Sequence, residues 1–275
     1  IKLRNRMKQR LIKILSFAIL LSSNLQAQTF NNLFRTKDRM DNLEDFDLKK
    51  FSYGFYLAAN NFDYKMVLNP TYGMDGNQSL VESKSTYSFG AGLIGKMRLN
   101  EFLDLRIEPG LHFVQRDLTF NTFNHINDLF PGGIPLPDGT NSEVITELND
   151  TYTKKIVKST YIDIPILLEI HGDRWYNSRP YAAAGINYLV NLQSNQTSGD
   201  DNLQNVFRTT THNFGWSAEI GIQLYFSRFK LTPAIRGTFF TNNELVSDNA
   251  TTPPYWTPAI STMQSRAFML VLKFE

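Results

Sequence analysis

The sequence contains no cysteine, only four histidines, and no apolar run long enough to cross a membrane as a helix. Without cysteine the chain cannot form a disulfide, so its stability must come from backbone pairing and side-chain packing. The histidines His112, His125, His171 and His212 are scattered and show no metal-ligand spacing. We therefore expect neither a metal ion nor another cofactor.

The first 27 residues have the three-part layout of a secretory signal peptide. Residues 7–10 (MKQR), with two basic side chains, precede an apolar run, residues 11–21, and a polar stretch that ends at Ala27. A membrane helix is the alternative, but the lysine-free part of the run has eight residues, whereas a spanning helix needs about 20. Cleavage is expected before Gln28, and the residues before Met7 are not expected to belong to the natural start.

Removal of this segment changes the charge of the chain. It takes away six basic residues and no acidic one, which leaves 22 basic and 26 acidic residues and a net charge of −4. The remainder shows no basic patch with interleaved aromatic residues, the pattern typical of nucleic-acid-binding proteins. We therefore expect no nucleic-acid partner.

Residues 28–50 are mixed and charged, and Leu33, Met40 and Leu43 are spaced as on one face of a short helix. We interpret them as a periplasmic leader segment. From residue 51 to residue 275, apolar and polar side chains alternate with period two, which predicts strands. In residues 161–170 all even positions are aliphatic, and the acidic residues Asp163 and Glu169 fall on the other face.

Eight segments show this alternation, and several exceed the roughly 5 or 6 residues typical of soluble strands. They are residues 51–59, 85–99, 102–118, 161–170, 179–192, 211–226, 229–240 and 264–274. The links between them alternate strictly between long (66–84, 121–153, 192–208, 242–262) and short (100–102, 172–178, 227–228). Outer-membrane barrels have short periplasmic turns and long outer loops.

The pattern therefore predicts an all-β protein, an eight-stranded antiparallel transmembrane barrel over residues 51–275. Both termini would lie in the periplasm, and the protein would lie in the outer membrane of a Gram-negative cell. A soluble lipocalin-like barrel is the alternative. Its connections would not be expected to alternate in this way, and nothing would cap a lumen lined with Phe, Ile and Leu.

In a membrane barrel the aliphatic face meets lipid and the other face fills the lumen. A two-residue turn at 227–228 sets Glu219 opposite Arg236, and a three-residue turn at 100–102 sets Arg98 opposite Asp104. We expect an ionic network that fills the lumen, in preference to a polar path or a ligand site. Its predicted members are Glu219, Arg236, Arg98, Asp104, Arg106, Glu108, Asp163 and Glu169.

Five aromatic residues are candidates for the membrane interface, where amphipathic rings are enriched. Trp175, Tyr176 and Tyr181 cluster at one short turn. Tyr255 and Trp256 lie in the last long link and would form either the opposite girdle or a partner-facing patch.

Two further features concern the backbone and assembly. Pro165 lacks an N–H group, so we expect a local bulge or a missing ladder bond there. Residues 268–274 alternate Phe and Leu in a way that resembles the signal read by the outer-membrane insertion machinery. We therefore expect contact with that machinery during biogenesis.

An enzymatic role is not expected. His125 lies near Asn127 and Asp128 in a predicted outer loop, which leaves open a hydrolase-like constellation. Loops rich in Asn, Asp and Thr contain such neighbours by chance, however.

Residues 161–170 (YIDIPILLEI), 179–190 (RPYAAAGINYLV) and 214–226 (FGWSAEIGIQLYF) together resemble the outer-membrane β-barrel family widespread in Bacteroidetes. The leader, the first strand with residues 51–65 (FSYGFYLAANNFDYK) and the overall length resemble the PorT proteins of type IX secretion and gliding motility. The resemblance implies an integral outer-membrane component that acts through contacts with other secretion-system proteins, as an accessory or assembly factor, and supplies no catalytic residues. The alternative is a self-contained surface barrel that binds a ligand or adheres through its outer loops.

Overall fold

The computed structural model describes residues 42–136, 139–142, 144–145, 150–199, 206–249 and 252–275. The predicted signal peptide, residues 1–27, and residues 28–41 of the predicted leader, including most of its expected helix, lie outside these ranges. The chain from Leu43 to Glu275 forms one compact unit.

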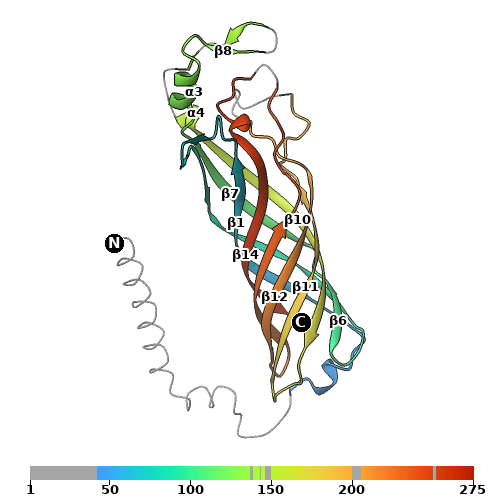
Figure 1. The fold of residues 1–275 in the computed structure, drawn as a ribbon. Coiled ribbons are helices and arrows are strands. Elements are labelled where there is room, and N and C mark those ends of the chain that lie inside the picture. The colour runs from blue at the N-terminus through green and yellow to red at the C-terminus, as the bar shows by residue number, and fades with distance from the viewer. Residues whose placement is uncertain (1–41, 137–138, 143, 146–149, 200–205, 250–251) are drawn as a thin grey trace, which may run out of the picture. The chain divides into compact units, whose positions relative to one another are not determined.

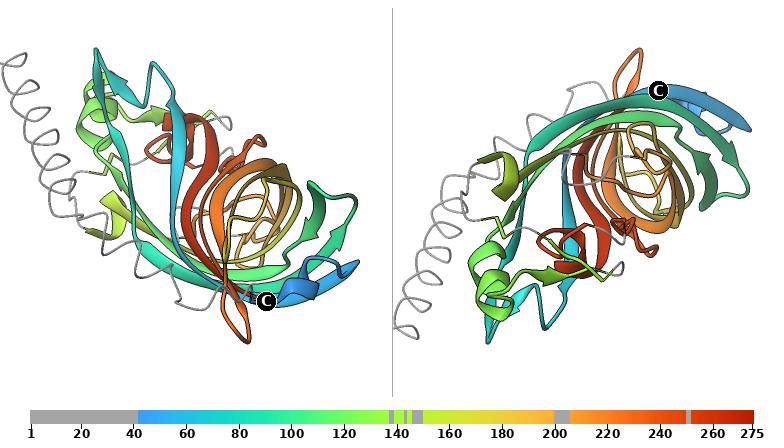
Figure 2. Two further views of the ribbon diagram at one scale, coloured as in Figure 1. Left: turned by 90° about the horizontal axis from the view of Figure 1, so that it is seen from below. Right: turned by 90° about the horizontal axis from the view of Figure 1, so that it is seen from above.

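Eight antiparallel strands of the described residues form a closed ring (Figures 1 and 2). The ring closes because β1 pairs with β14 on one side and with β5 on the other. Two strands of the ring are interrupted, so that each consists of two consecutive segments: β4 (Val81–Ser85) with β5 (Tyr87–Arg98), and β6 (Leu103–Ile107) with β7 (Gly110–Phe120). The other six are β1 (Phe51–Leu68), β10 (Lys154–His171), β11 (Ser178–Asn191), β12 (His212–Tyr225), β13 (Lys230–Phe240) and β14 (Ile260–Phe274). The prediction of an eight-stranded antiparallel barrel is confirmed.

Some strands extend beyond their predicted bounds. β1 and β10 each have 18 residues, whereas the sequence predicts strands over 51–59 and 161–170. The alternation continues past the apolar part, but most of the outward residues there are polar, as Lys65 and Lys158 show. The apolar stripe on which the prediction rested therefore ends before the strand does.

Short and long connections alternate around the ring as predicted. The short ones, residues 99–102, 172–177 and 226–229, lie at what we call the short-turn end. The long ones, residues 69–80, 121–153, 192–211 and 241–259, lie at the long-loop end. The predicted link 66–84 is shorter than expected because β1 runs to Leu68 and β4 begins at Val81.

The long-loop end carries the remaining small elements. They are the hairpins β2 (Met74–Asp75) with β3 (Gln78–Ser79) and β8 (Ile134–Pro135) with β9 (Asn141–Ser142), the helices α3 (Phe123–Leu129) and α4 (Asp150–Thr153), and the 3₁₀ turn η3 (Thr257–Ala259). A second 3₁₀ turn, η1 (Glu44–Phe46), precedes β1. No helix in the described part of the chain is long and apolar enough to cross a membrane.

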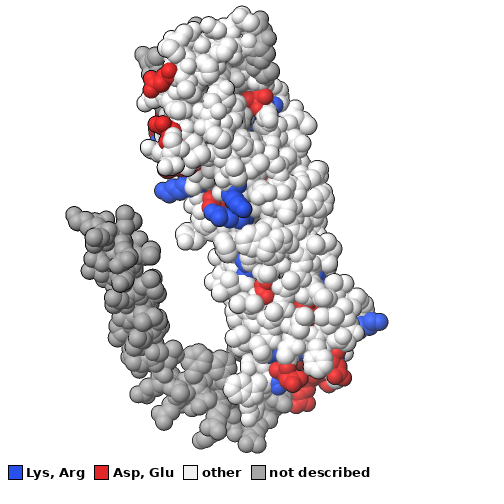
Figure 3. All heavy atoms as spheres, viewed as in Figure 1, with Lys and Arg blue, Asp and Glu red and all other residues white. Residues whose placement is uncertain are grey.

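The outer wall of the barrel is apolar. Large hydrophobic side chains point outward from the strands, and Tyr53, Leu93 and Ile220 are 85%, 66% and 63% exposed. Figure 3 shows a wall made mostly of uncharged residues. Because soluble monomers rarely expose a contiguous apolar surface of this extent, this wall is suited to lipid.

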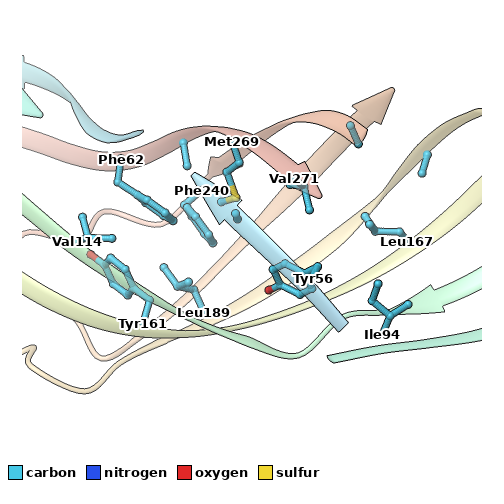
Figure 4. Packing of buried hydrophobic residues seen from close by; sticks show 14 of the residues in the cluster. Tyr56, Phe62, Ile94, Val114, Tyr161, Leu167, Leu189, Phe240, Met269 and Val271 are labelled. Carbon is cyan, nitrogen blue, oxygen red and sulfur yellow. The ribbon is translucent and has the colours of Figure 1, made fainter. Parts of the chain in front are cut away.

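The interior is filled in part by apolar side chains. Tyr56, Phe62, Tyr161, Leu189 and Met269 are at most 3% exposed and lie within the ring (Figure 4). The rings of Phe62 and Tyr161 stack with their centroids 5.5 Å apart. An eight-stranded barrel is just wide enough for such filling.

The predicted registers hold at both tested turns. Glu219 pairs with Arg236 across β12 and β13, and the N–H of Phe226 donates to the carbonyl of Phe229 over 3.0 Å. Arg98 pairs with Asp104 across β5 and β6.

The expected irregularity at Pro165 is a missing ladder bond and not a bulge. The N–H of Glu108 donates to the carbonyl of Pro165 over 3.2 Å, but proline has no N–H to return the bond. Pairing of β10 continues without a register shift on both sides, from Ile107 opposite Ile166 to Gly110 opposite Asp163. The break between β6 and β7 therefore lies opposite this proline.

Candidate functional site: the lumen and its two mouths

Alternation along the strands places charged side chains inside the ring. They come from most of its circumference, because inward positions on β6, β10, β12, β13 and β14 converge at one level. The central cluster consists of Arg106, Glu108, Glu169, Glu219, Arg236 and Lys273, each at most 1% exposed. Three cations and three carboxylates make this cluster electrically balanced.

Glu219 is the most connected member. Arg236 donates to it through Nε over 2.7 Å, and Arg106 and Lys273 form ion pairs with the same carboxylate. The Tyr181 hydroxyl adds a hydrogen bond of 2.7 Å. Removal of one carboxylate would thus leave three buried cations short of a partner.

Glu108 and Glu169 complete the cluster. Glu108 lies 2.6 Å from Nε of Arg106 and 3.1 Å from the ammonium of Lys273, and it also pairs with Arg236. Glu169 pairs with Arg106 and accepts a hydrogen bond of 2.5 Å from the amide of Gln223. Such dense pairing offsets the desolvation cost that isolated buried charges would carry.

Tyr181 donates to Glu219 of this cluster, so its prediction as an interface residue is wrong. It is 6% exposed and lies on the inward face of β11, together with Ala183. Its neighbours in sequence, Trp175 and Tyr176, lie in the adjoining turn and are 74% and 57% exposed. The structure therefore separates the three aromatics, because only Tyr181 falls on a strand with an inward phase.

A second charged group lies nearer the short-turn end. Asp104 is 3.3 Å from the ammonium of Lys96 and 3.4 Å from Nε2 of His171. Lys96 is also 3.9 Å from Glu275, which pairs with Lys230.

Arg98 does not join the lumen network as predicted. Its guanidinium donates to the main-chain oxygens of Asp47 over 2.5 Å and Asn100 over 3.2 Å. The register with Asp104 is correct, but Arg98 stands at the last position of β5, so its long side chain reaches the rim. Lys96, one inward position deeper, supplies the cation for Asp104 instead.

Asp163 is likewise separate from the ionic cluster. Its two carboxylate oxygens accept hydrogen bonds from the amide of Asn187 at 3.0 and 3.1 Å, and within the described residues it forms no ion pair. Asn187 in turn accepts from Ser217, whose hydroxyl lies 2.8 Å from that of Thr238. A neutral polar chain, and not a salt bridge, therefore surrounds Asp163.

The short-turn mouth is covered by the residues that precede β1. The Asp47 carboxylate accepts from the Tyr225 hydroxyl over 2.8 Å and from Arg179 over 3.0 Å, and it lies 3.6 Å from Arg174. The ring of Phe46 lies 4.7 Å from the ammonium of Lys230. We call Asp47 and its three partners, Arg174, Arg179 and Tyr225, the clamp.

We expect replacement of Asp47 by alanine to release residues 43–50 from the mouth. The loss leaves Arg174 and Arg179 without this carboxylate, and lost charged hydrogen bonds of this kind cost about 1–3 kcal/mol. Limited proteolysis of the solubilised protein should then cleave within residues 42–50 roughly tenfold faster, while the barrel stays intact.

Asp45→Ala is the matched control, because Asp45 is exposed and lies outside the clamp. Equal cleavage rates for wild type and Asp47→Ala would show that the clamp does not hold this segment.

An aromatic cluster that includes Tyr255 and Trp256 packs at the long-loop end of the barrel. Both are fully buried, so their prediction as a girdle or a partner-facing patch is wrong. Phe123 of α3 stacks on Tyr255 with centroids 4.5 Å apart and meets Trp256 at 5.8 Å. The indole N–H of Trp256 donates to the carbonyl of Tyr152 over 2.9 Å. We call these four residues the cap.

Arg116 lies inside the barrel near this end. It donates to the hydroxyl of Ser265 over 2.8 Å, and its guanidinium lies 3.8 Å from the ring centre of Tyr64. The same Ser265 hydroxyl donates to Glu244 over 2.9 Å. Burial raises the pKa of the Glu244 carboxyl, although Arg116 and the hydrogen bonds from Ser265 act in the opposite direction.

Several of these residues are not among those predicted from the sequence. The alternation in residues 268–274 places Lys273 on the inward face, so that signal was present. Arg116 follows equally from the phase of β7, where His112 and Val114 point inward. No sequence pattern predicts the clamp, because its residues come from separate turns and strands.

The metal-ligand and loop constellations considered from the sequence can be compared with the contacts of the described residues. Among the residues that the structure describes, no group of three or more His, Asp and Glu side chains is placed to hold a metal ion. His125 bonds the carbonyl of Thr71 over 3.0 Å, whereas Asn127 bonds Tyr255. His125 and Asn127, which the sequence places near each other in a possible hydrolase-like group, therefore bond to different parts of the long-loop end.

A comparison with known protein families agrees with this architecture. The family described as "Outer membrane protein beta-barrel domain" matches residues 16–243. No curated protein matches the sequence.

Three solved structures are similar at low identity. OprG from Pseudomonas aeruginosa has a TM-score of 0.38 and 9% identity, over 80% of this chain and 93% of that one. Neisserial surface protein A has a TM-score of 0.35 and 12% identity, over 82% and 98%. Outer membrane protein W of E. coli has a TM-score of 0.33 and 15% identity, over 82% and 98%. Because the family match spans most of the sequence, this chain belongs to the outer membrane protein β-barrel family.

Proposed function

We propose that this barrel is a non-conducting, non-catalytic component of the outer membrane that serves type IX protein secretion and gliding motility. It would act as an accessory or assembly factor through protein–protein contacts with other components of the secretion system. The sequence resemblance to PorT proteins supplies this specific assignment.

The observation that carries the proposal is the filled lumen. Arg106, Glu219, Arg236 and their partners occupy the middle of the barrel, the clamp covers one mouth and the cap packs at the other end. Because the lumen is filled, the parts of the barrel that remain available for contacts with partners are the segment before the clamp, the outer loops and the lipid-facing wall.

The orientation is part of the proposal. Short turns face the periplasm and long loops face outward in barrels of this class. The clamp and Glu275 would then lie on the periplasmic side, and the segment that precedes Asp47 would emerge there, within reach of periplasmic or inner-leaflet partners.

Deletion of the gene tests the proposal. We expect cells without the protein to retain in the cell those cargo proteins that carry a C-terminal sorting domain, and to recover their secretion when the full chain is restored. Intact secretion together with lost surface binding would replace the proposal with the ligand-binding or adhesive barrel.

A co-purification experiment locates the contact. The variant should lack residues 28–42 only, because residues 43–50 pack on the barrel and their removal would disturb it. We expect other secretion components to be lost from this variant while Asp45→Ala retains them. If they still co-purify, the contact lies on the loops or the wall and not on the leader.

A further inference from the structure

An open groove of about 330 Å³ lies on the short-turn rim, between the start of β1 and the turn that joins β5 to β6. It lies where the apolar outer wall ends and the short-turn mouth begins. Its lining residues are Leu48, Lys50, Arg98, Leu99, Asn100 and Glu101.

The groove contains two cations and one carboxylate. Within the described part of the chain, the Arg98 guanidinium donates only to main-chain oxygens, and the Lys50 ammonium lies 6.0 Å from the ring centre of Phe51. In the described ranges, neither they nor Glu101 form an ion pair with another side chain of the chain. The site therefore presents two positive charges and one negative charge that the protein itself leaves unbalanced.

Apolar side chains flank these charges on the side of the wall. Leu48 is 70% exposed and Leu99 is 47% exposed, and the exposed rings of Phe51 and Phe102 stand beside them. Phe51 pairs with Met97 at the end of the outward apolar surface. This is the level at which lipid headgroups meet the wall of a membrane barrel.

We propose that this groove binds one phospholipid with a primary-amine headgroup, of the phosphatidylethanolamine type, from the leaflet at the short-turn end. The phosphate lies between Lys50 and Arg98, the headgroup ammonium donates to Glu101, and the acyl chains begin along Leu48 and Leu99. Every charged side chain of the groove then has a partner.

Other common headgroups match the groove less well. A phosphatidylglycerol places its anionic phosphate on the cations but offers Glu101 no ammonium. A phosphatidylcholine has a quaternary ammonium without an N–H group, so it cannot donate a hydrogen bond to the carboxylate. Glu101 is thus the residue that selects the amine, and Lys50 is a residue that binds any phosphate.

The test uses the full chain, delipidated in detergent and titrated with short-chain phosphatidylethanolamine and phosphatidylcholine, with bound lipid counted by native mass spectrometry. We expect wild type to prefer the ethanolamine lipid on the order of threefold, as for one exposed ion pair. Glu101→Gln should abolish that preference, and Lys50→Gln should weaken both lipids about threefold.

Matched controls lie on the same rim outside the groove. Asp173→Asn and Arg228→Gln remove exposed charges from the other two short turns and should leave both affinities unchanged. Retention of the folded, SDS-resistant form verifies each variant. Equal binding of the two lipids to wild type, a preference that survives Glu101→Gln, or no lipid bound at all would overturn the proposal.

Discussion

Replacement of Arg236 by leucine is expected to lower the free energy of unfolding by about 3–5 kcal/mol, the range found when one partner of a buried ion pair is removed. Arg236 pairs with both Glu108 and Glu219 and is fully buried. Its loss leaves three central carboxylates with two cations. Chemical unfolding of the refolded protein in detergent or lipid vesicles, followed by tryptophan fluorescence, measures the change.

Arg266→Leu is the control for this prediction. Arg266 also lies on a barrel strand and pairs with Asp63 at 2.8 Å, but its side chain is 44% exposed. Exposed pairs contribute at most about 1 kcal/mol, so this variant should unfold close to wild type.

A double-mutant cycle separates the ion pair from general disruption. Arg236→Gln and Glu219→Gln together restore the charge balance of the cluster, so their combined effect should be smaller than the sum of the single effects by about 0.5–3 kcal/mol. Strict additivity, or an Arg236→Leu protein as stable as wild type, would show that the cluster does not stabilise the barrel.

Replacement of Trp256 by alanine has the second largest expected effect, and it is local. The side chain is fully buried against Phe123 and Tyr255 and donates to Tyr152. Large-to-small changes of this kind cost about 3–5 kcal/mol. We expect the cap to open while the strands stay paired, so hydrogen exchange should accelerate in α3 and in residues 252–259 but not in β12 or β13.

Trp175→Ala provides the comparison, because Trp175 lies at the opposite end and is 74% exposed. Its exchange pattern should match that of wild type. Faster exchange throughout the barrel of Trp256→Ala would mean that the cap and the barrel unfold as one unit.

The barrel itself could be predicted from the sequence because strand phase and turn length are determined by residues that are close together in the chain. Period-two alternation fixes which side chains point inward, and a two-residue turn then fixes the register that brings Glu219 opposite Arg236. The same alternation places Lys273 on the inward face of β14, although the residues around it in the sequence are apolar.

The errors occurred where position depends on tertiary contacts. Tyr255 and Trp256 occupy a loop whose sequence does not show that α3 folds over it. Arg98 has the right register but stands at a strand end, where a long side chain can turn toward the rim. Tyr181 is close to Trp175 in the sequence, but the phase of β11 points it inward.

Planar-bilayer recording of the purified full chain tests the filled lumen most directly, with insertion verified by flotation of the same protein with lipid vesicles. We expect no stable conductance steps, because the central ion cluster and side chains such as Tyr56 and Phe62 occupy the interior. A steady ionic current through the folded wild-type protein would show that the lumen is a path and not a plug.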